Sequence, residues 1–255
     1  MRSIAVPLLR LVSVFLFSLL VGSVLAADVT VFAAASLADA LSELAPLHTK
    51  ATGDTLRFNF GASGTLARQI QAGAPADVIV SADELRIDRL EQAGLLVAGS
   101  RRTILANQLV LVVAADGGAP IAALPDLAKP AVKRIAIGEP ATVPVGTYTK
   151  EHFQKLGLWP QVSSKCVPLD NVRAVLAAVE AGNADAGLVY RTDALISKKV
   201  WIAVAVPLTE GPKITYPAAV LRDAKEPEAA AKFAAFLAGP EAREVFAKYG
   251  FLPAP

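Results

Sequence analysis

Histidine and cysteine are scarce in this chain of 255 residues, and their scarcity excludes several kinds of chemistry. Cys166 is the single cysteine, so no disulfide can form within the chain, and its apolar-leaning surroundings predict a buried, inert thiol. His48 and His152 are the two histidines, and we expect each of them in a polar helical segment. A zinc site built from protein side chains or a cysteine–histidine catalytic pair needs a cluster that this sequence does not have.

The N-terminus has the pattern of a cleavable secretory signal peptide. Residues 1–26 carry Arg2 and Arg10, no acidic residue and a long apolar run, and they end in Val24-Leu25-Ala26. Small residues at the two positions that signal peptidase reads predict cleavage after Ala26. A retained membrane anchor is the alternative, and the cleavage site argues against it. We therefore expect an exported, soluble mature chain that begins at Ala27.

A surplus of either charge is also missing from the mature chain. The full sequence has 25 basic and 23 acidic residues, and the signal segment accounts for two of the basic ones, which leaves 23 of each. This balance argues against a basic surface for nucleic acid or for an anionic membrane.

Strand-like and helix-like runs alternate along the mature chain, which is long enough for two modest domains. We expect strands at 28–34, 55–60, 77–81, 104–115, 133–138, 162–167, 186–190, 200–206 and 214–222. We expect helices at 37–51, 65–72, 84–93, 147–157, 171–182, 191–197, 226–238 and 240–248. This alternation predicts an α/β protein with parallel, doubly wound sheets that carry helices on both faces.

Two long β-rich stretches indicate how two domains are connected. "RTILANQLVLVVAA" starts at residue 102 and "KITYPAAVLRD" starts at residue 213. If the chain leaves a first domain through one and returns through the other, residues 27–107 and 218–255 form domain I, and residues 108–217 form domain II. The C-terminal helices would then pack on domain I, and a ligand cleft would lie between the domains at the C-terminal ends of the strands.

Two serines lie among small residues where a strand passes into a helix. Ser36 lies in "VFAAASLADAL" and Ser63 in "NFGASGTLARQI". The first N–H groups of a helix lack intrahelical acceptors and carry the positive end of the helix dipole, and small neighbours let an anion approach them. Each serine can therefore be an anion ligand, or it can be an ordinary N-cap of its own helix. The local sequence leaves both interpretations open.

Motifs for hydrolysis or phosphate transfer are incomplete. "GASGT" is close to the nucleophile elbow G-x-S-x-G, but Thr65 takes the place of the second glycine, and neither histidine lies late in the chain after an acid. No glycine-rich loop ends in Gly-Lys-Ser or Gly-Lys-Thr, as a P-loop requires. A secreted hydrolase is therefore a weaker interpretation than a binding protein.

Five segments, which cover essentially all of the mature chain, carry a more specific signal than any single motif. They are "VTVFAAASLADAL", "ASGTLARQIQAGAPADVIVSAD", "IGEPATVPVGTYTKEHFQKLG", "DNVRAVLAAVEAGNADAGLVYRTDA" and "YPAAV...FLAGPEAREVFAKYGF". In the same order, they resemble segments of the periplasmic molybdate-binding proteins of the ABC importers for molybdate. The resemblance implies a type II periplasmic-binding-protein fold with two domains, hinged by two crossing strands, and a ligand cleft between the domains. It implies a monomeric periplasmic receptor that delivers molybdate, and tungstate as well, to a membrane permease, with no enzymatic activity and no cofactor.

The same resemblance implies which residues hold the oxyanion. Ser36 and Ser63 match serines that offer hydroxyl and backbone donors from the first domain. Val145 and Val172 match positions whose backbone N–H groups donate, although the family commonly has alanine in place of Val145. Tyr190 matches a tyrosine whose hydroxyl completes the set. Molybdenum would be bound as the oxyanion, with no metal ligated directly by side chains.

The local sequence around these residues fits such roles. Asp170 is the expected N-cap that leaves the Val172 N–H free, and Pro144 suits the approach to a helix start. Arg68 and Arg173 are expected to be solvated and outside the site. Sulfate or another tetrahedral oxyanion has the same charge and donor needs, so it remains the main alternative ligand. A ferric-ion receptor would want adjacent tyrosines or carboxylates.

Overall fold

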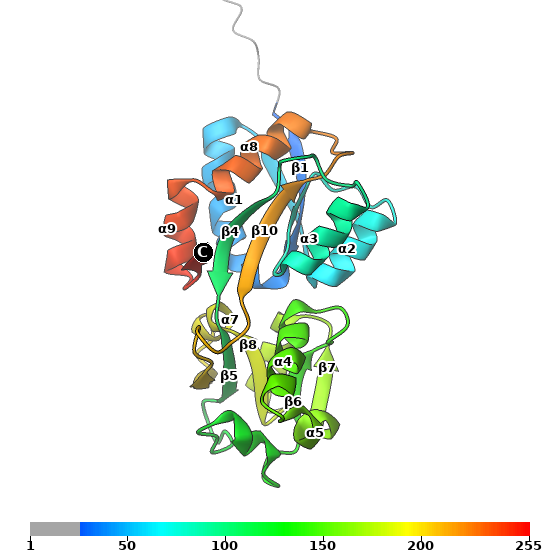
Figure 1. Cartoon of the computed structure of the whole chain (residues 1–255). Coiled ribbons are helices and arrows are strands. Elements are labelled where there is room, and N and C mark those ends of the chain that lie inside the picture. The colour runs from blue at the N-terminus through cyan, green and yellow to red at the C-terminus, as the bar shows by residue number, and fades with distance from the viewer. Residues whose placement is uncertain (1–25) are drawn as a thin grey trace, which may run out of the picture.

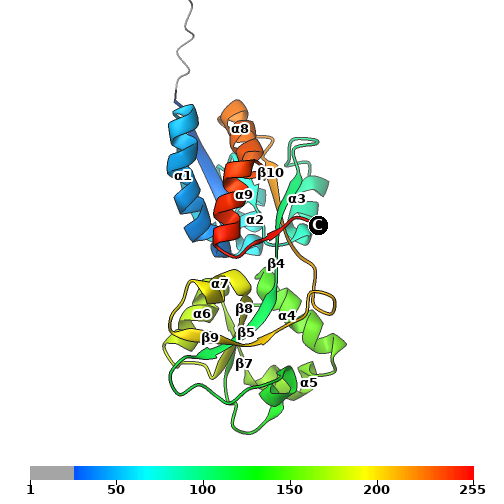
Figure 2. The same ribbon diagram turned by 90° about the vertical axis from the view of Figure 1, so that its left-hand side faces the viewer.

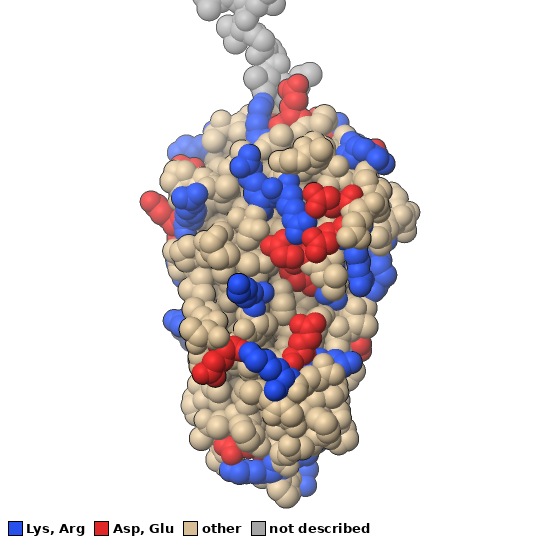
Figure 3. All heavy atoms as spheres, in the orientation of Figure 1, with Lys and Arg blue, Asp and Glu red and all other residues tan. Residues whose placement is uncertain are grey.

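The computed structural model describes residues 26–255, and it consists of two α/β domains, one above the other (Figure 1). The signal segment expected at residues 1–26 lies, apart from Ala26, outside the described residues. No helix in the described part of the chain is long and apolar enough to span a membrane. Basic and acidic side chains are interspersed on the face seen in Figure 3, as the balanced composition predicts.

The first domain is built on a sheet of six strands. In spatial order they are β11 (Leu252–Pro253), β4 (Arg102–Asn107), β10 (Ile214–Val220), β3 (Val78–Val80), β1 (Asp28–Ala34) and β2 (Thr55–Gly61). Its helices are α1 (Ala38–Thr52), α2 (Ser63–Gln71), α3 (Glu84–Gln92), α8 (Pro227–Leu237) and α9 (Pro240–Lys248), with the short 3-10 helix η1 (Ala35–Leu37) before α1. Figures 1 and 2 show α1, α8 and α9 on one face of this sheet and α2 and α3 on the other.

The second domain is built on a sheet of five strands. In spatial order they are β7 (Cys166–Leu169), β6 (Ile135–Gly138), β8 (Ala186–Tyr190), β5 (Leu109–Ala114) and β9 (Val200–Ala205). Its helices are α4 (Pro144–Lys155), α5 (Trp159–Val162), α6 (Val172–Glu180) and α7 (Arg191–Leu195), with the 3-10 helices η2 (Leu124–Ala128) and η3 (Ser163–Lys165). The sequence reading missed α5, the 3-10 helices and β11, because such short elements have no periodicity of their own.

Both sheets are mixed, so the prediction of parallel sheets is wrong. Within the first sheet β1 runs parallel to β2 and β3, but β10 runs antiparallel to β3 and β4. Within the second sheet β6 runs parallel to β7 and β8, but β5 runs antiparallel to β8 and β9. The reason is the connection between the domains. A strand that arrives from the other domain begins at the cleft, where its neighbours end, and Leu109 accordingly pairs with Tyr190.

The chain crosses between the domains twice, and the two crossings lie together. The expected strand over 104–115 is in fact β4 and β5, with Gln108 alone between them. The return runs through residues 206–213 and enters the first sheet at Ile214, which pairs with Asn107. Ile214 lies four residues before residue 218, where the second segment of domain I was expected to begin. The Gln108 side chain donates to the Val206 carbonyl over 2.8 Å, and the Val206 N–H donates to the Leu109 carbonyl over 3.1 Å.

The C-terminal helices pack on the first domain, as the sequence predicts. Residues Ala40, Leu41, Leu44 and His48 of α1 are buried on one stripe of that helix, the spacing of an amphipathic helix. Outside this stripe, Lys248 of α9 donates to Glu43 of α1 over 2.7 Å. Figure 2 shows α1 and α9 side by side, which places the C-terminal helix of the chain against the N-terminal part of the first domain.

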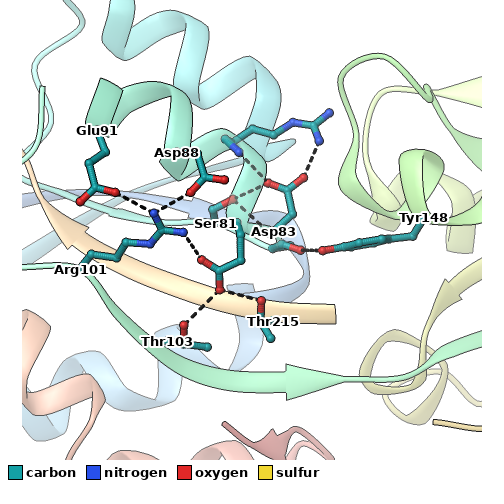
Figure 4. A network of polar contacts seen from close by, with 11 residues as sticks. Ser81, Asp83, Asp88, Glu91, Arg101, Thr103, Tyr148 and Thr215 are labelled. Carbon is teal, nitrogen blue, oxygen red and sulfur yellow. Dashed lines mark hydrogen bonds and ion pairs between the residues drawn. The ribbon is translucent and has the colours of Figure 1, made fainter. Parts of the chain in front are cut away.

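A charged network attaches α3 to the strands that lead to the cleft (Figure 4). Arg101 contacts Asp88 at 2.7 Å and Glu91 at 2.8 Å, and it also pairs with Glu84. Glu84 in turn accepts hydrogen bonds from threonines of β4 and β10, namely Thr103 at 3.1 Å and Thr215 at 2.8 Å. The network holds the start of α3, and with it the turn that precedes α3, in a fixed position against the sheet.

Candidate functional site

The five predicted site residues line one pocket between the domains. Ser36 and Ser63 come from the first domain, and Val145, Val172 and Tyr190 come from the second. The pocket is narrow, with a cavity volume of about 10 Å³, and the rest of its wall consists of small or uncharged residues, namely Ala34, Ala35, Gly61, Ala62, Ala82, Val143, Pro144 and Asn171. It lies at the C-terminal ends of β1, β2 and β8, which is the edge of an α/β sheet where ligands bind.

A larger groove lies elsewhere but has a different character. It runs between α9, β4 and β11 and is lined mainly by apolar side chains, among them Ile104, Leu105, Phe246 and Phe251. The polar groups of the interdomain pocket converge from several helix starts, and this groove has no comparable convergence. The interdomain pocket is therefore the candidate site.

Neither serine is the side-chain cap of its own helix. The N-cap positions of η1 and α2 are Ala34 and Ala62, and each of these helices lacks a side-chain cap hydrogen bond. Ser63 Oγ instead accepts a hydrogen bond from the Ala82 N–H over 3.0 Å, and Ser36 Oγ lies 3.0 Å from the Tyr216 hydroxyl. The interpretation of both serines as ordinary N-caps is excluded. Because α2 begins at residue 63, two residues before the expected start, Ser63 lies in its first turn.

Two helices of the second domain direct backbone donors toward the pocket. Val172 is the first residue of α6, and Asn171 is its N-cap, not Asp170 as predicted. The Asn171 carboxamide oxygen accepts hydrogen bonds from the N–H groups of Arg173 and Ala174, the two residues after Val172, at 2.9 and 3.0 Å. The N–H of Val172 is left without a capping acceptor, and at the start of a helix it has no intrahelical one.

The second of these helices is α4, which begins at residue 144, three residues before the expected start. Pro144 takes the first position of α4, where its missing N–H costs nothing, and Val145 takes the second. The Val145 N–H is one of the orphan donors of this helix start. Both helix starts carry the positive end of a helix dipole, so the wall of the second domain favours an anion although no cationic side chain lines it.

Tyr190 supplies a buried hydroxyl that lacks a protein partner. It is the last residue of β8 and is 1% exposed, and among the described residues its hydroxyl has no hydrogen-bond partner. Burial raises the pKa of the phenol well above 10, so the group keeps its proton at neutral pH. Buried hydroxyls are normally hydrogen-bonded, and a hydroxyl on a pocket wall without a protein partner indicates a place for a ligand atom.

The prediction that Arg173 is solvated is wrong. Arg173 joins the two domains beside the pocket. Its Nη2 donates to Asp39 Oδ2 over 2.6 Å and to the Ser36 carbonyl over 3.4 Å, both in the first domain. Its Nε lies 2.7 Å from Asp193 Oδ1 in the second domain, an ion pair by distance without the alignment of a hydrogen bond. The guanidinium charge is thus balanced by two carboxylates. Arg68, by contrast, is exposed as predicted.

A second set of contacts closes the opposite side of the pocket. Arg86 of α3 pairs with Asp83 at 2.5 Å and donates across the cleft to the Ala141 carbonyl at 3.2 Å. Gly64 donates its N–H to the Thr142 carbonyl over 3.1 Å. The Tyr148 side chain of α4 points toward the turn after β3, where its hydroxyl lies 3.5 Å from the Ala82 carbonyl (Figure 4). The domains are in direct contact on both sides of the pocket.

The structure also brings residues to the site that the sequence reading missed. Tyr216 of β10 and Asn107 of β4 lie directly behind Ser36, and Ala82 and Asn171 belong to the pocket wall. A signal was present in the sequence, because Asn107 follows the apolar run at residues 104–106 of β4 and Tyr216 precedes the apolar run at residues 217–220 of β10. Such buried polar groups need partners, but the sequence does not show which partners they have.

Metal and thiol chemistry find no support in the described residues. No group of three or more histidine, cysteine, aspartate or glutamate side chains is placed to hold a metal ion in that part of the chain. Cys166 is half-buried, its Sγ donates to the Val162 carbonyl over 3.4 Å, and burial raises the pKa of the thiol to about 11. The thiol is therefore protonated at neutral pH, as an inert thiol should be, but it is half-buried and not buried as predicted.

Two α/β domains joined by two crossings, with a pocket of hydrogen-bond donors between them, define a solute-binding protein of the hinged, type II kind. The family model for bacterial extracellular solute-binding proteins matches residues 29–252, and this chain belongs to that family.

Relatives with specific names are also similar to the chain. The putative ABC transporter substrate-binding lipoprotein YvgL of Bacillus subtilis is 41% identical over 223 residues, which cover 87% of this chain and 85% of that protein. The molybdate-binding protein ModA of Escherichia coli is 39% identical over 233 residues, 88% of each chain. The structure of the periplasmic molybdate-binding protein of Azotobacter vinelandii superposes with a TM-score of 0.80 at 26% identity, and covers 89% of this chain and all of that one.

Proposed function

We propose that this protein is a periplasmic receptor that binds molybdate, and tungstate as well, and delivers it to the membrane permease of an ABC importer. One observation carries the proposal. The pocket between the domains collects helix-start N–H groups, two serine hydroxyls and the Tyr190 hydroxyl, and no charged side chain lines it. The relatives that are named for molybdate binding support the choice of oxyanion. The receptor acts as a monomer and without catalysis.

A dianion can be held in this pocket without a counter-charge. Hydrogen bonds to a charged acceptor contribute roughly 1.5–3 kcal/mol each, so several donors in fixed positions can replace the hydration shell. Such donors suit an oxyanion that carries no proton, because a proton on the ligand would need an acceptor. Molybdate, tungstate and sulfate meet this condition, and hydrogen phosphate does not.

Calorimetric titration of the mature protein with molybdate, tungstate, sulfate and phosphate tests the proposal. We expect tight binding of molybdate and tungstate, weak binding of sulfate because the anion is smaller, and still weaker binding of phosphate because it carries a proton. Sulfate is the alternative ligand, since it has the same charge and the same need for donors. Tighter binding of sulfate than of molybdate would assign the receptor to sulfate.

Removal of either serine hydroxyl should weaken molybdate binding without unfolding the protein. Ser36→Ala and Ser63→Ala each delete one donor to a charged acceptor, so we expect each to cost about 1.5–3 kcal/mol of binding free energy. Val145→Ala is the control on the opposite wall of the pocket, because the proposed contact of Val145 is its backbone N–H, and it should change the affinity little. Titration of the three variants decides the matter, and wild-type affinity in both serine variants would remove the serines from the site.

Molybdate should also stabilise the folded protein and favour the closed form. The donors belong to both domains, so the closed form binds the anion better than an open one, and this difference in affinity drives closure. Binding to the native state alone adds about 2.7 kcal/mol to the free energy of unfolding when the ligand is at one hundred times its Kd. Thermal melts and small-angle scattering, each with and without molybdate, measure the two effects. A stabilised protein with unchanged dimensions would contradict the hinge.

A further inference from the structure

A chain of hydrogen bonds runs from the hinge to the pocket through Asn107, Tyr216 and Ser36. Asn107 is the last residue of β4, next to the point where the chain crosses into the second domain. Its Nδ2 lies 3.1 Å from the Tyr216 hydroxyl, and that hydroxyl lies 3.0 Å from Ser36 Oγ. The three residues are at most 3% exposed, so water does not compete for these bonds.

The direction of this chain follows from its first member. The Asn107 Oδ1 accepts from the Gln108 N–H over 2.9 Å, which identifies the other atom, Nδ2, as the amide nitrogen that can only donate. Nδ2 has two hydrogens and two partners, the Tyr216 hydroxyl and, at 2.9 Å, the Thr192 hydroxyl. Tyr216 Oη therefore accepts from Asn107.

The single hydrogen of the Tyr216 hydroxyl then has one place to go. Ser36 Oγ is the remaining polar atom in hydrogen-bond contact with Tyr216 Oη among the described residues. Burial raises the pKa of Tyr216, so the phenol keeps this hydrogen at neutral pH. Because Ser36 Oγ accepts from Tyr216, its own hydrogen is free to point into the pocket that Ser36 lines.

We propose that Asn107 and Tyr216 are positioning residues that hold the Ser36 hydroxyl as a hydrogen donor toward the bound oxyanion. This inference rests on the proposed oxyanion receptor and deepens it, because it explains how a hydroxyl, which can donate or accept, acts in one sense only. The Ser63 hydroxyl is also left to donate into the pocket, because its Oγ accepts a hydrogen bond directly from the Ala82 N–H. The chain of hydrogen bonds from Asn107 through Tyr216 to Ser36, called the relay below, thus excludes ligands for which Ser36 must accept a hydrogen bond. Protonated oxyanions are such ligands.

The relay also crosses the hinge. The second hydrogen of Asn107 Nδ2 goes to Thr192 in the second domain, two residues beyond Tyr190. One amide group therefore connects the hydroxyl of the first domain, through Tyr216, with the segment of the second domain that carries the Tyr190 hydroxyl. The orientation of Ser36 is thereby set in the closed arrangement, in which both domains contact the ligand.

The first test compares sulfate with phosphate, two oxyanions of similar size that differ in the proton. In Tyr216→Phe the Ser36 hydroxyl is free to rotate and can accept a hydrogen from hydrogen phosphate. We expect the ratio of phosphate affinity to sulfate affinity to rise by about tenfold, the size of one hydrogen bond to a charged group, while molybdate affinity falls severalfold. Ser36→Ala is the control, because it weakens all the anions without raising this ratio. An unchanged ratio in Tyr216→Phe would overturn the proposal.

The second test reverses the relay. In Asn107→Asp a carboxylate replaces the donor and accepts the Tyr216 hydrogen, so Ser36 must donate to Tyr216 and turn its lone pairs to the anion. The new charge also repels the anion, and Asn107→Asp in a Tyr216→Phe background measures that repulsion alone. We expect Asn107→Asp to weaken molybdate at least about tenfold more with Tyr216 present than in that background. Equal losses in both backgrounds would refute the relay.

Failure of the relay can be told apart from failure of the proposed function. If the wild-type protein does not bind molybdate, the proposed function fails. If the wild type binds and the two relay measurements show no effect, the relay alone fails. Melting curves without anion verify that each variant is folded, and if Asn107→Asp does not fold, the phosphate-to-sulfate ratio in Tyr216→Phe decides the proposal by itself.

Discussion

Gly64→Ala is expected to lower molybdate affinity by about 3 kcal/mol while the protein remains folded. Gly64 lies in the first turn of α2, and in the closed arrangement a Cβ at this position would lie 2.3 Å from the Thr142 carbonyl oxygen of the other domain. Overpacking of this kind costs about 1–3 kcal/mol, and here the clash is with backbone that cannot turn aside. The domains could not close as they do around the pocket, and the donors of the second domain would be held away from the anion.

Titration with molybdate measures the loss, and small-angle scattering shows whether the variant still becomes more compact with ligand. Gly61→Ala is the control in the same segment, because a Cβ there would make ordinary contacts with Leu66, the nearest at 3.4 Å, and no atom of the second domain lies within 4 Å. The free energy of unfolding without ligand should not fall in Gly64→Ala, since alanine is a better helix residue than glycine. Wild-type affinity in Gly64→Ala would mean that closure does not bring Gly64 against Thr142.

Arg173→Met is expected to destabilise the protein by about 3 kcal/mol at pH 8 and by much less at pH 5. Asp193 is fully buried, and its pKa is already raised to about 6 by burial, in spite of the Arg173 guanidinium, which lowers it. Removal of the guanidinium leaves a buried carboxylate without its counter-charge, which is the costly way to break an ion pair. The expected destabilisation of about 3 kcal/mol is at the low end of the range for buried ion pairs, because the Arg173 side chain is 26% exposed.

The sign of the pH dependence follows from the raised pKa of Asp193. Between the ordinary aspartate pKa of 3.8 and the folded value of about 6, the unfolded chain loses this proton while the folded protein keeps it, so stability falls as the pH rises. In Arg173→Met the folded pKa is higher still, so the fall continues above pH 6, and the deficit relative to wild type develops there. Denaturant unfolding at pH 5 and pH 8 measures it. Asp193→Asn in the Arg173→Met background is the control, because it removes the group that titrates and with it the pH dependence. If Arg173→Met alone loses the same free energy of unfolding at both pH values, this account is wrong.

The sequence by itself determined the order of the helices and strands and the residues of the candidate site. Strand and helix periodicities are local, so most boundaries were predicted within one to three residues, and strands 28–34 and 186–190 and helix 240–248 were predicted as they are. The joins at Ser36 and Ser63 were recognisable because small residues before a helix are a local pattern. The resemblance to molybdate-binding proteins brought Val145, Val172 and Tyr190 to the same site, and they line one pocket with the two serines.

Only the tertiary structure decided what these groups do there. Whether Ser63 caps its own helix or accepts from Ala82 depends on a turn 19 residues away, and the direction of the Ser36 hydroxyl depends on Tyr216, 180 residues further along the chain. Arg173 was expected in solvent because a helical arginine usually is, but carboxylates from both domains hold it beside the cleft. Local sequence patterns report backbone periodicity, whereas hydrogen-bond direction and charge balance depend on partners that folding alone brings within 3 Å.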